Sequence, residues 1–236
     1  MKGKLLVIEG MGGSGKSTVC DKIEKWLQDS NMPYIRTREP GGTVAAEYLR
    51  QLCRQGIPGD PTKLEPITVA LLYNAARAEN VAKVIRPALA EGKVVLCDRF
   101  VDSTLAYQGG YGGVDYEVLQ GIHDLSHGIN ADLTLLLDGE PATFLMRISD
   151  EEKATDQFDN LKLAEYDRVR EAYRQVAVGS SRHRVINAMQ PEAQVFAQIL
   201  PFLLKLQNDM MQRPLVRGAW GIRNTIPRHE FDGIND

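Results

Sequence analysis

The stretch "GMGGSGKST", residues 10–18, comes directly after the apolar run "KLLVIE", residues 4–9. Its glycines, lysine and serine have the spacing G-x-x-x-x-G-K-S, which is typical of a phosphate-binding loop of the Walker A type. Such a loop joins a strand to a helix, and the apolar run before it and the helical pattern after it meet both conditions. The sequence therefore predicts a strand–loop–helix unit that holds a phosphate chain.

The chemistry of this loop lies in its backbone and in two side chains. The glycines let N–H groups approach an anion, and these groups add to the positive end of the following helix. We expect Lys16 to reach the β- and γ-phosphates and the Ser17 hydroxyl to ligate Mg²⁺. A chance glycine-rich turn is the alternative, which the strand–helix context disfavours. The predicted phosphate site comprises Gly10, Met11, Gly12, Gly13, Ser14, Gly15, Lys16, Ser17 and Thr18.

Beyond this unit, apolar β-branched runs alternate with helical patterns. Strands are predicted at residues 4–9, 32–37, 93–98, 132–138 and 182–188. Helices are predicted at about 16–29, 44–55, 66–91, 116–127, 141–148, 159–177 and 192–209. This alternation predicts an α/β fold, a doubly wound five-stranded parallel sheet with helices on both faces. We expect one domain over residues 1–208 and an irregular tail over 209–236, in which periodicity is lost.

Charge and cysteine content narrow the classes of partner. The formal net charge is −3, which argues against a nucleic acid polymer as ligand. No apolar run approaches the roughly 20 residues of a membrane span. Cys20, Cys53 and Cys97 are scattered without metal-ligand spacing, so we expect buried thiols in a reducing compartment and a cytoplasmic protein.

The segment "CDRF", residues 97–100, closes the third predicted strand. Asp98 can hold Mg²⁺ through water, and Arg99 can direct two N–H donors at a second phosphate. A surface ion pair is the alternative for this dipeptide. Because ligands of parallel sheets collect at the carboxyl ends of the strands, we expect both residues beside the loop.

Three further segments supply polar and aromatic side chains near strand ends. "DSTLAYQGG" can place Ser103, Thr104, Tyr107 and Gln108 on one helical face. "RTREPGGT" ends the second strand with two arginines, and "LLYNAAR" places an aromatic ring four residues before an arginine. Taken singly, such an aromatic residue is more often part of the core. Together, the segments predict a pocket for an aromatic, phosphorylated small molecule.

The segments "GKST", "TREPGGT", "LLYNAAR", "CDRF…STLAYQGG" and "DLTLLLD" resemble, in this order, those of the thymidylate kinase family of P-loop nucleoside monophosphate kinases. The resemblance extends from about residue 2 to about residue 206. It implies the P-loop kinase fold and the phosphorylation of dTMP to dTDP, with ATP as donor and Mg²⁺ as cofactor. It also implies a homodimer, for which the segment 66–91 could provide the contact.

The resemblance implies roles for individual acceptor-site residues. Tyr73 stands where the family has a phenylalanine stacked on thymine. Arg77, helped by Thr104 and Gln108, would bind the edge of the base. Tyr107 would lie against C2′ of the sugar. The acceptor phosphate would be held by Arg99 and Arg38, with Arg50 as a further candidate and Glu39 in the same segment.

The chain departs from the family at the cation that stabilises the transferred group. The loop has Gly12 where the family has an acid and contains no arginine, so a lid at about residues 147–159 should supply the cation. That lid is acidic, and Arg147 is expected near the donor base. Lys153 is therefore the first candidate catalytic cation. The alternatives are a tail arginine (Arg213, Arg217, Arg223 or Arg228) and a slow enzyme.

These departures also bear on the substrate. A phenol at residue 73 and a missing carboxylate at residue 12 predict tolerance for dUMP or a 5-substituted analogue. One alternative is a P-loop kinase that acts on a deoxynucleoside or on another deoxynucleotide. The other alternative is a non-catalytic nucleotide-binding protein with a degenerate lid.

Overall fold

The computed structural model describes residues 3–56, 62–150 and 161–211 of the chain. Its centre is a five-stranded parallel sheet with the order β2-β3-β1-β4-β5. The strands are β1 (Lys4–Glu9), β2 (Tyr34–Arg38), β3 (Val94–Asp98), β4 (Leu133–Asp138) and β5 (His183–Asn187). The predicted doubly wound sheet is therefore confirmed, and each strand lies within two residues of its predicted position.

The glycine-rich stretch follows the central strand. β1 pairs with β3, with Ile8 opposite Asp98, and on its other side with β4, with Leu6 opposite Leu133. Both faces of β1 are buried, because helices cover the sheet from two sides. The register brings the ends of β1 and β3 together, so the loop after β1 lies beside Asp98.

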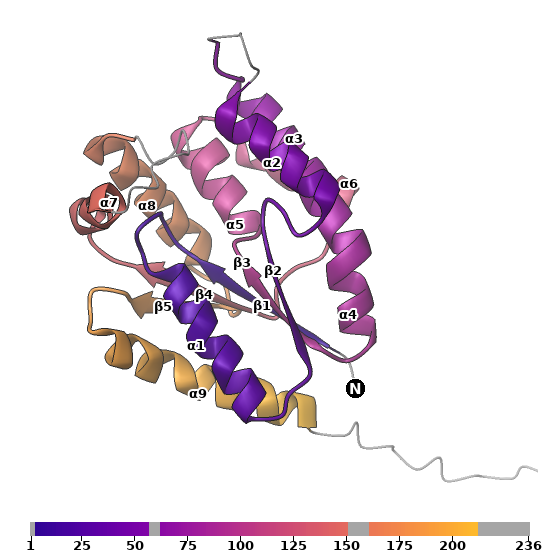
Figure 1. Ribbon diagram of the computed structural model, residues 1–236. Helices are drawn as coiled ribbons and strands as arrows, with labels where there is room; N and C mark the ends of the chain where they lie inside the picture. The colour runs from indigo at the N-terminus through magenta and orange to yellow at the C-terminus, as the bar shows by residue number, and fades with distance from the viewer. Residues whose placement is uncertain (1–2, 57–61, 151–160, 212–236) are drawn as a thin grey trace, which may run out of the picture.

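Two hydrophobic cores hold the helices on the sheet. Leu6 and Ile8 pack with side chains of α1 (Lys16–Asp29) and α9 (Glu192–Met211). Leu5 and Val7, which point to the opposite face, pack with η1 (Val81–Ile85) and α4 (Arg86–Ala90). Figure 1 shows α1 and α9 along one side of the sheet and α4 on the other.

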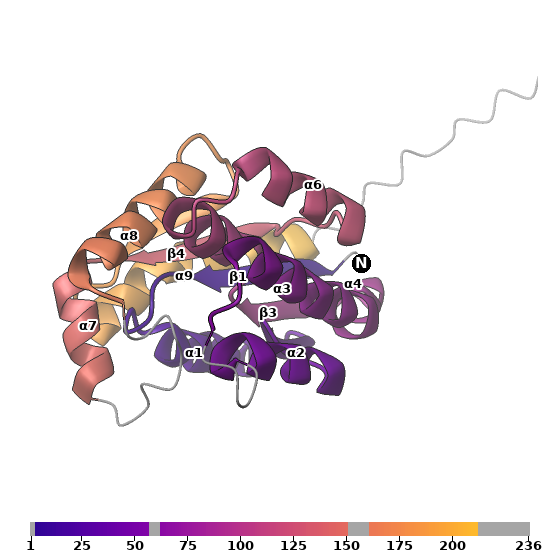
Figure 2. The same ribbon diagram turned by 90° about the horizontal axis from the view of Figure 1, so that it is seen from above.

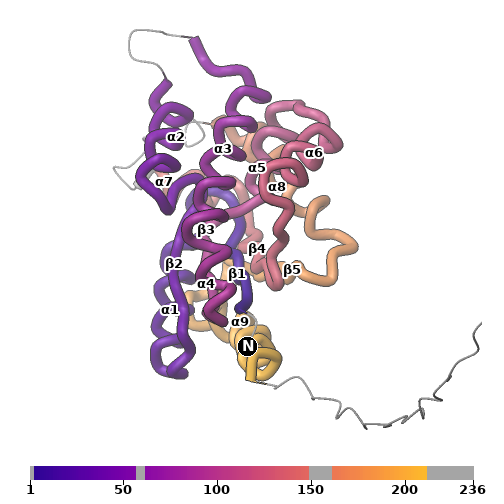
Figure 3. The backbone as a smooth tube through the Cα atoms, turned by 90° about the vertical axis from the view of Figure 1, so that its right-hand side faces the viewer, coloured from indigo at the N-terminus to yellow at the C-terminus, as the bar shows by residue number. Residues whose placement is uncertain are grey.

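The remaining helices gather near the carboxyl ends of the strands. α2 (Val44–Gln55) and α3 (Pro66–Asn80) pack against each other and extend beyond the strands (Figure 3). The others are α5 (Val101–Thr104), η2 (Leu105–Tyr111), α6 (Tyr116–Ser126), α7 (Pro141–Asp150) and α8 (Leu163–Ala177). In η1 and η2 the helical turns are of the wider π type. The pocket-lining helices α3 and α5 and the π segment η2 thus surround the strand ends.

Two boundaries differ from the sequence prediction. α9 continues to Met211, so the first three residues of the predicted tail are helical. α8 begins at Leu163, later than the predicted start at residue 159. Residues 212–236 of the predicted tail and 151–159 of the predicted lid lie outside the described residues.

Two further expectations concern the burial of the cysteines and the possibility of a membrane-spanning helix. Cys20, Cys53 and Cys97 are buried and form no disulfide. Among the described helices, none has both the length and the apolar character needed to cross a membrane.

Candidate active site

The loop after β1 needs glycine at its sharpest positions. Gly13 has a φ of +70°, and a Cβ there would lie 2.2 Å from the carbonyl oxygen of Phe144 on α7. Gly10 has a φ of +140°, and a Cβ there would lie 2.7 Å from the carbonyl oxygen of Leu137. Positive φ strains other residues, and neither neighbour leaves room for a side chain. Close packing against β4 and α7 therefore fixes the shape of the loop.

Lys16 lies in the first turn of α1, and its ammonium group is directed back into the loop. Nζ donates a hydrogen bond of 2.7 Å to the carbonyl oxygen of Met11. Burial, and next the positive charge of Arg99, lower the pKa of Lys16 from 10.5 to about 7. A phosphate chain in the loop would supply the missing negative charge and favour the protonated amine. Lys16 is therefore placed to gain its charge when the donor binds.

Asp98 and Ser17 are the residues predicted to hold Mg²⁺. Oδ1 of Asp98 is buried and has no hydrogen-bond partner among the described residues. Ser17, in the first turn of α1, is exposed beside the loop. Carboxylate and hydroxyl oxygens suit Mg²⁺, and an unpartnered buried carboxylate oxygen is what a hydrated cation would satisfy. The residues present therefore fit this ion, whereas no cluster of three or more His, Cys, Asp or Glu occurs in the described ranges.

Arg99 connects the phosphate loop to the acceptor side. Its Nη1 donates to the carbonyl oxygen of Gly10 at 3.0 Å, to Oγ of Ser103 at 3.2 Å and to the hydroxyl of Tyr173 at 3.2 Å. The guanidinium lies 5.6 Å from the ring centroid of Tyr107. Its backbone has a φ of +68°, an uncommon conformation for a side-chain-bearing residue, which clusters at functional sites. One side chain thus spans the two halves of the site.

Glu9, the last residue of β1, organises the residues around Arg99. Its carboxylate accepts hydrogen bonds from the backbone N–H of Phe100 at 2.7 Å and of Ser103 at 3.2 Å. It also accepts from Oγ of Ser103 at 2.7 Å and from the hydroxyl of Tyr173 at 3.1 Å. Burial, and next the charge of Asp102, raise the pKa of Glu9 from 4.5 to about 7. Glu9 therefore ties α5 and α8 to the central strand.

The sequence prediction placed Glu9 in the strand but gave it no role. The sequence did indicate a role for Glu9, since a carboxylate that follows the apolar residues of a strand must find partners when it is buried. The partners themselves were not predictable, because Tyr173 is 164 residues away along the chain.

The acceptor pocket lies between α2, α3, α5 and η2. Nine of the ten predicted acceptor residues line it, and the exception is Arg38. The sequence prediction missed three lining residues, Pro40, Arg54 and Phe100. The full lining is Glu39, Pro40, Arg50, Arg54, Tyr73, Arg77, Arg99, Phe100, Ser103, Thr104, Tyr107 and Gln108.

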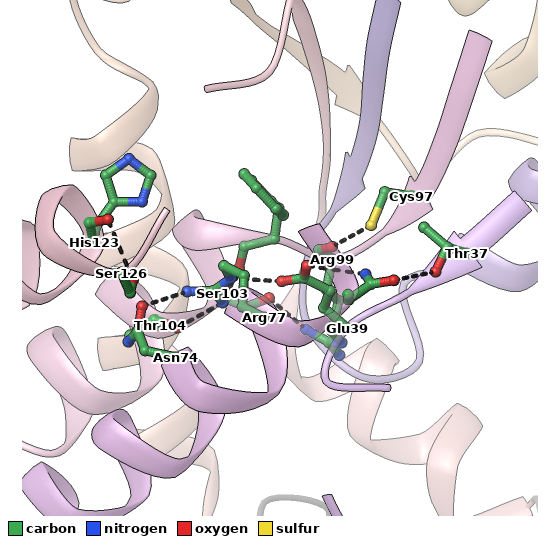
Figure 4. Close-up of polar contacts among 12 residues, drawn as sticks. Thr37, Glu39, Asn74, Arg77, Cys97, Arg99, Ser103, Thr104, His123 and Ser126 are labelled. Atoms are coloured by element: carbon green, nitrogen blue, oxygen red, sulfur yellow. Dashed lines mark hydrogen bonds and ion pairs between the residues drawn. The ribbon is translucent and has the colours of Figure 1, made fainter. Parts of the chain in front are cut away.

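Arg77 is the buried centre of this wall. Its Nε donates to Oε2 of Glu39 at 2.5 Å, and its Nη1 donates to Oδ1 of Asn74 at 3.2 Å. Its Nη2 donates to the carbonyl oxygen of Phe100 at 3.0 Å and to Oγ1 of Thr104 at 2.9 Å. Figure 4 shows Arg77 between Glu39 on one side and Asn74 and Thr104 on the other. These bonds occupy four of its five N–H groups, so Arg77 fixes the wall and has one N–H group left for a ligand.

Arg38 and Arg50 take different positions. Arg38 lies at the surface and forms an ion pair with Glu47 at 3.0 Å, outside the pocket. Arg50 lines the pocket, and its Nη1 donates to the carbonyl oxygen of Pro40 at 2.9 Å. An open groove along α2, of about 910 Å³, contains both arginines and also Arg54.

Arg147 is the part of the predicted lid that lies on a described helix, α7. Its Nη1 is 3.3 Å from the carbonyl oxygen of Gly13, and its guanidinium lies 5.5 Å from the ring centroid of Phe144. Arg147 therefore borders the phosphate loop, and its expected place near the donor base stays a prediction. Lys153 and the tail arginines Arg213, Arg217, Arg223 and Arg228 lie outside the described residues.

Comparisons with known proteins agree with this geometry. The sequence model of a family described as thymidylate kinase matches residues 8–199. A thymidylate kinase from Pelotomaculum thermopropionicum is 42% identical over 202 residues, which cover 85% of this chain and 92% of that protein. One from Clostridium novyi is 40% identical over 205 residues, covering 86% and 98%. The crystal structure of thymidylate kinase from Ehrlichia chaffeensis superposes with a TM-score of 0.67 at 28% identity, covering 88% of this chain and all of that one.

Proposed function

The chain belongs to the thymidylate kinase family, and we propose that it transfers the γ-phosphoryl group of ATP to dTMP, giving ADP and dTDP. The observation that carries this proposal is the position of Arg99. Its guanidinium contacts the phosphate loop through Gly10 and the acceptor pocket through Ser103. A group that touches both halves is suited to hold an acceptor phosphate in line with a donor phosphate.

The residues act by position and charge. An oxygen of the dTMP phosphate bonds to the γ-phosphorus while the bond from that phosphorus to the β–γ bridging oxygen breaks. Lys16 and the loop amides stabilise the leaving ADP, and Arg99 stabilises the acceptor oxygens. No side-chain nucleophile is needed. No strong base is needed either, because a phosphate monoester is largely ionised at neutral pH.

We propose Asp98 and Ser17 as the residues that hold Mg²⁺. The buried, unpartnered Oδ1 of Asp98 and the exposed hydroxyl of Ser17 supply oxygen ligands beside the loop. When bound, Mg²⁺ neutralises charge on the phosphates. Asp98 orients the ion or its water shell from β3, and Ser17 does so from α1.

A direct assay tests this activity. Purified full-length protein with ATP, Mg²⁺ and dTMP should release ADP only when dTMP is present. Arg99→Lys should lower kcat by on the order of 10²-fold, because an ammonium cannot span both halves as a guanidinium does. ADP release that does not depend on dTMP, together with activity on a deoxynucleoside, would favour the alternative of a P-loop kinase that acts on a deoxynucleoside. Nucleotide binding without any ADP release would indicate the non-catalytic alternative.

We propose Lys153 as the lid cation, since the phosphate loop contains no arginine and the predicted lid contains only Arg147 and Lys153 as cations. A cation of this kind contributes on the order of 10³-fold or more to the rate. Lys153→Ala and a chain truncated after Gln212 separate Lys153 from the tail arginines. If both keep the wild-type rate, the slow-enzyme alternative stands.

We also propose that the enzyme tolerates dUMP and 5-substituted dUMP. Tyr73 lines the pocket with a phenol where the family has a phenylalanine, and Gly12 offers no carboxylate for the 3′-hydroxyl. A panel of monophosphates tests this proposal. Strict preference for dTMP, with 3′-deoxy analogues rejected, would contradict it.

A homodimer is proposed from an apolar face formed by α3 and α6. These helices pack side by side (Figure 2), and Leu71 and Leu125 on them are 51% and 92% exposed. Exposed apolar side chains on two packed helices favour a protein partner. Light scattering should give a dimer mass for the wild type and a monomer mass for Leu71→Glu with Leu125→Glu, whereas Leu204→Glu, at an exposed position of α9 that packs with α1 on the sheet, should leave the dimer intact. A monomeric wild type would contradict the proposal. The absence of a disulfide among the three cysteines further favours a cytoplasmic setting.

A further inference from the structure

The acceptor pocket and the outer groove share a wall. Arg50 and Arg54 stand one turn apart on α2, and both line the pocket and the groove. The groove is open to solvent and has a volume of about 910 Å³. A ligand in the pocket therefore meets, at this wall, two guanidinium groups with open space behind them.

The packing of the helices places this wall at the base end of the pocket. Arg99, bound to Gly10, marks the phosphate end. α2 leads away from the strand ends and α3 returns toward them, so later residues of α2 lie level with earlier residues of α3 (Figure 3). Arg54 is one turn, about 6 Å, farther along α2 than Arg50, which contacts Pro40. Arg54 lines the same pocket as Tyr73, the residue expected against the base, and its neighbour Cys53 clusters with Tyr73.

The chemistry of this wall offers more to a polar substituent than to the methyl group of thymine. Three arginines and one carboxylate, Glu47, line the groove within the described residues. The polar side chains of Gln51, Gln55, Tyr48 and Thr43 also line it, together with Gly42 and Val44. Arg50 and Arg54 also contact other parts of the chain, so a ligand would share their donors. A carboxylate or hydroxyl could accept from them, whereas the methyl group of thymine could not.

We propose that the acceptor site accommodates pyrimidine deoxynucleoside monophosphates whose ring carries an anionic or hydroxyl-bearing substituent on the edge facing α2. The substituent lies at Arg50 and Arg54 and extends into the groove. Arg54 is then a specificity-determining residue. This inference rests on the proposed phosphorylation of dTMP, because it uses the same pocket and the same orientation of the nucleotide.

The experiment compares dTMP, dUMP and 5-carboxy-dUMP with wild-type protein, Arg54→Leu and Arg54→Lys. Binding is measured by calorimetry without ATP, and kcat/KM is measured by ADP release. We expect 5-carboxy-dUMP to bind the wild type more tightly than dUMP does. Arg54→Leu should lower the ratio of kcat/KM for 5-carboxy-dUMP to that for dTMP by about tenfold or more, and Arg54→Lys by less, because it keeps the charge.

The control is Arg174→Leu, which removes an exposed arginine of α8 that lines neither cavity. It should leave the substrate ratio unchanged, and melting temperatures verify that each variant folds. An unchanged ratio in Arg54→Leu, or 5-carboxy-dUMP binding no tighter than dUMP, would overturn the proposal. Wild type that binds 5-carboxy-dUMP as expected but phosphorylates no nucleotide would instead refute the proposed function and leave the subsite standing.

Discussion

The donor and acceptor halves of the site hold their ligands by different means. The donor half is a backbone loop whose shape depends on glycines packed against β4 and α7. The acceptor half is made of side chains from β1, α2, α3, α5, η2 and α8 that already bond to one another, with Arg77 and Arg99 at its centres. Substitution of one side chain in the donor half should therefore lower activity alone, whereas substitution in the acceptor half should lower stability as well.

The largest effect on stability is expected at the Arg77–Glu39 pair. Both side chains are almost fully buried, at 4% and 1% exposure, so Glu39→Ala leaves a charged guanidinium without its carboxylate. The free energy of unfolding should fall by about 3–5 kcal/mol, measured by urea denaturation. Glu47→Ala removes the exposed partner of Arg38 and should cost at most about 1 kcal/mol. Equal losses in the two variants would show that burial of the Arg77–Glu39 pair does not set its contribution to the stability of the acceptor half.

On the donor side, Lys16→Ala should remove activity with little loss of stability. We expect kcat to fall by on the order of 10²–10³-fold, because a charge directed at the transferred group is lost. At pH 8 the free wild type holds Lys16 mostly neutral, since its pKa is about 7, and bound phosphates favour the charged form. ATP binding at pH 8 should therefore take up protons, detected by calorimetry in buffers of different ionisation enthalpy. Uptake that persists in Lys16→Ala would assign the proton to another group.

Glu9 should give the acceptor half a pH-dependent stability. Its pKa is raised from 4.5 to about 7, so the folded state holds the proton more tightly than the unfolded chain. The stabilisation is full below about pH 4.5 and is lost as the pH rises to about 7. As the pH rises from about 4.5 to about 7, the free energy of unfolding of the wild type should fall. In Glu9→Gln it should fall by on the order of 1–3 kcal/mol less. Parallel curves for the two proteins would show that Glu9 does not titrate there.

The smallest effect is expected for Tyr173→Phe, which keeps the ring and removes the hydroxyl shared by Arg99, Ser103 and Glu9. We expect kcat/KM for dTMP to fall by about tenfold, with the affinity for ATP less affected. Binding by calorimetry and steady-state kinetics measure the two effects separately. An equal loss of ATP affinity would place the role of Tyr173 on the donor side.

The sequence predicted the donor half better than the acceptor half for a physical reason. Phosphate binding by backbone needs glycine, lysine and serine at fixed spacing, so one short stretch specifies it. The acceptor pocket forms only when separate helices pack, so Arg54 and Phe100 line it without a local signal. Arg38 was predicted in the pocket from a motif, whereas in the structure Glu47 pairs with it at the surface.

The helix boundaries show the same limit. The start of α1 was predicted because a glycine-rich loop precedes it, and Gly15 indeed occupies the cap with a φ of +89°. The end of α9 was predicted two residues early, since its last turn is amphipathic and Met210 is buried against the core by tertiary contacts. Glu9 likewise acquires its partners only through the fold.

Arg99 contacts Gly10 of the donor loop and Ser103 of the acceptor pocket through the same nitrogen. An acceptor phosphate that binds this nitrogen competes with the loop carbonyl for its N–H groups. A donor that changes the shape of the loop changes how available these N–H groups are to the acceptor. The two substrates are then thermodynamically linked. Whatever factor ATP imposes on the affinity for dTMP, dTMP must impose on the affinity for ATP. A shared guanidinium thus makes the mutual effect of the two proposed substrates depend on one side chain.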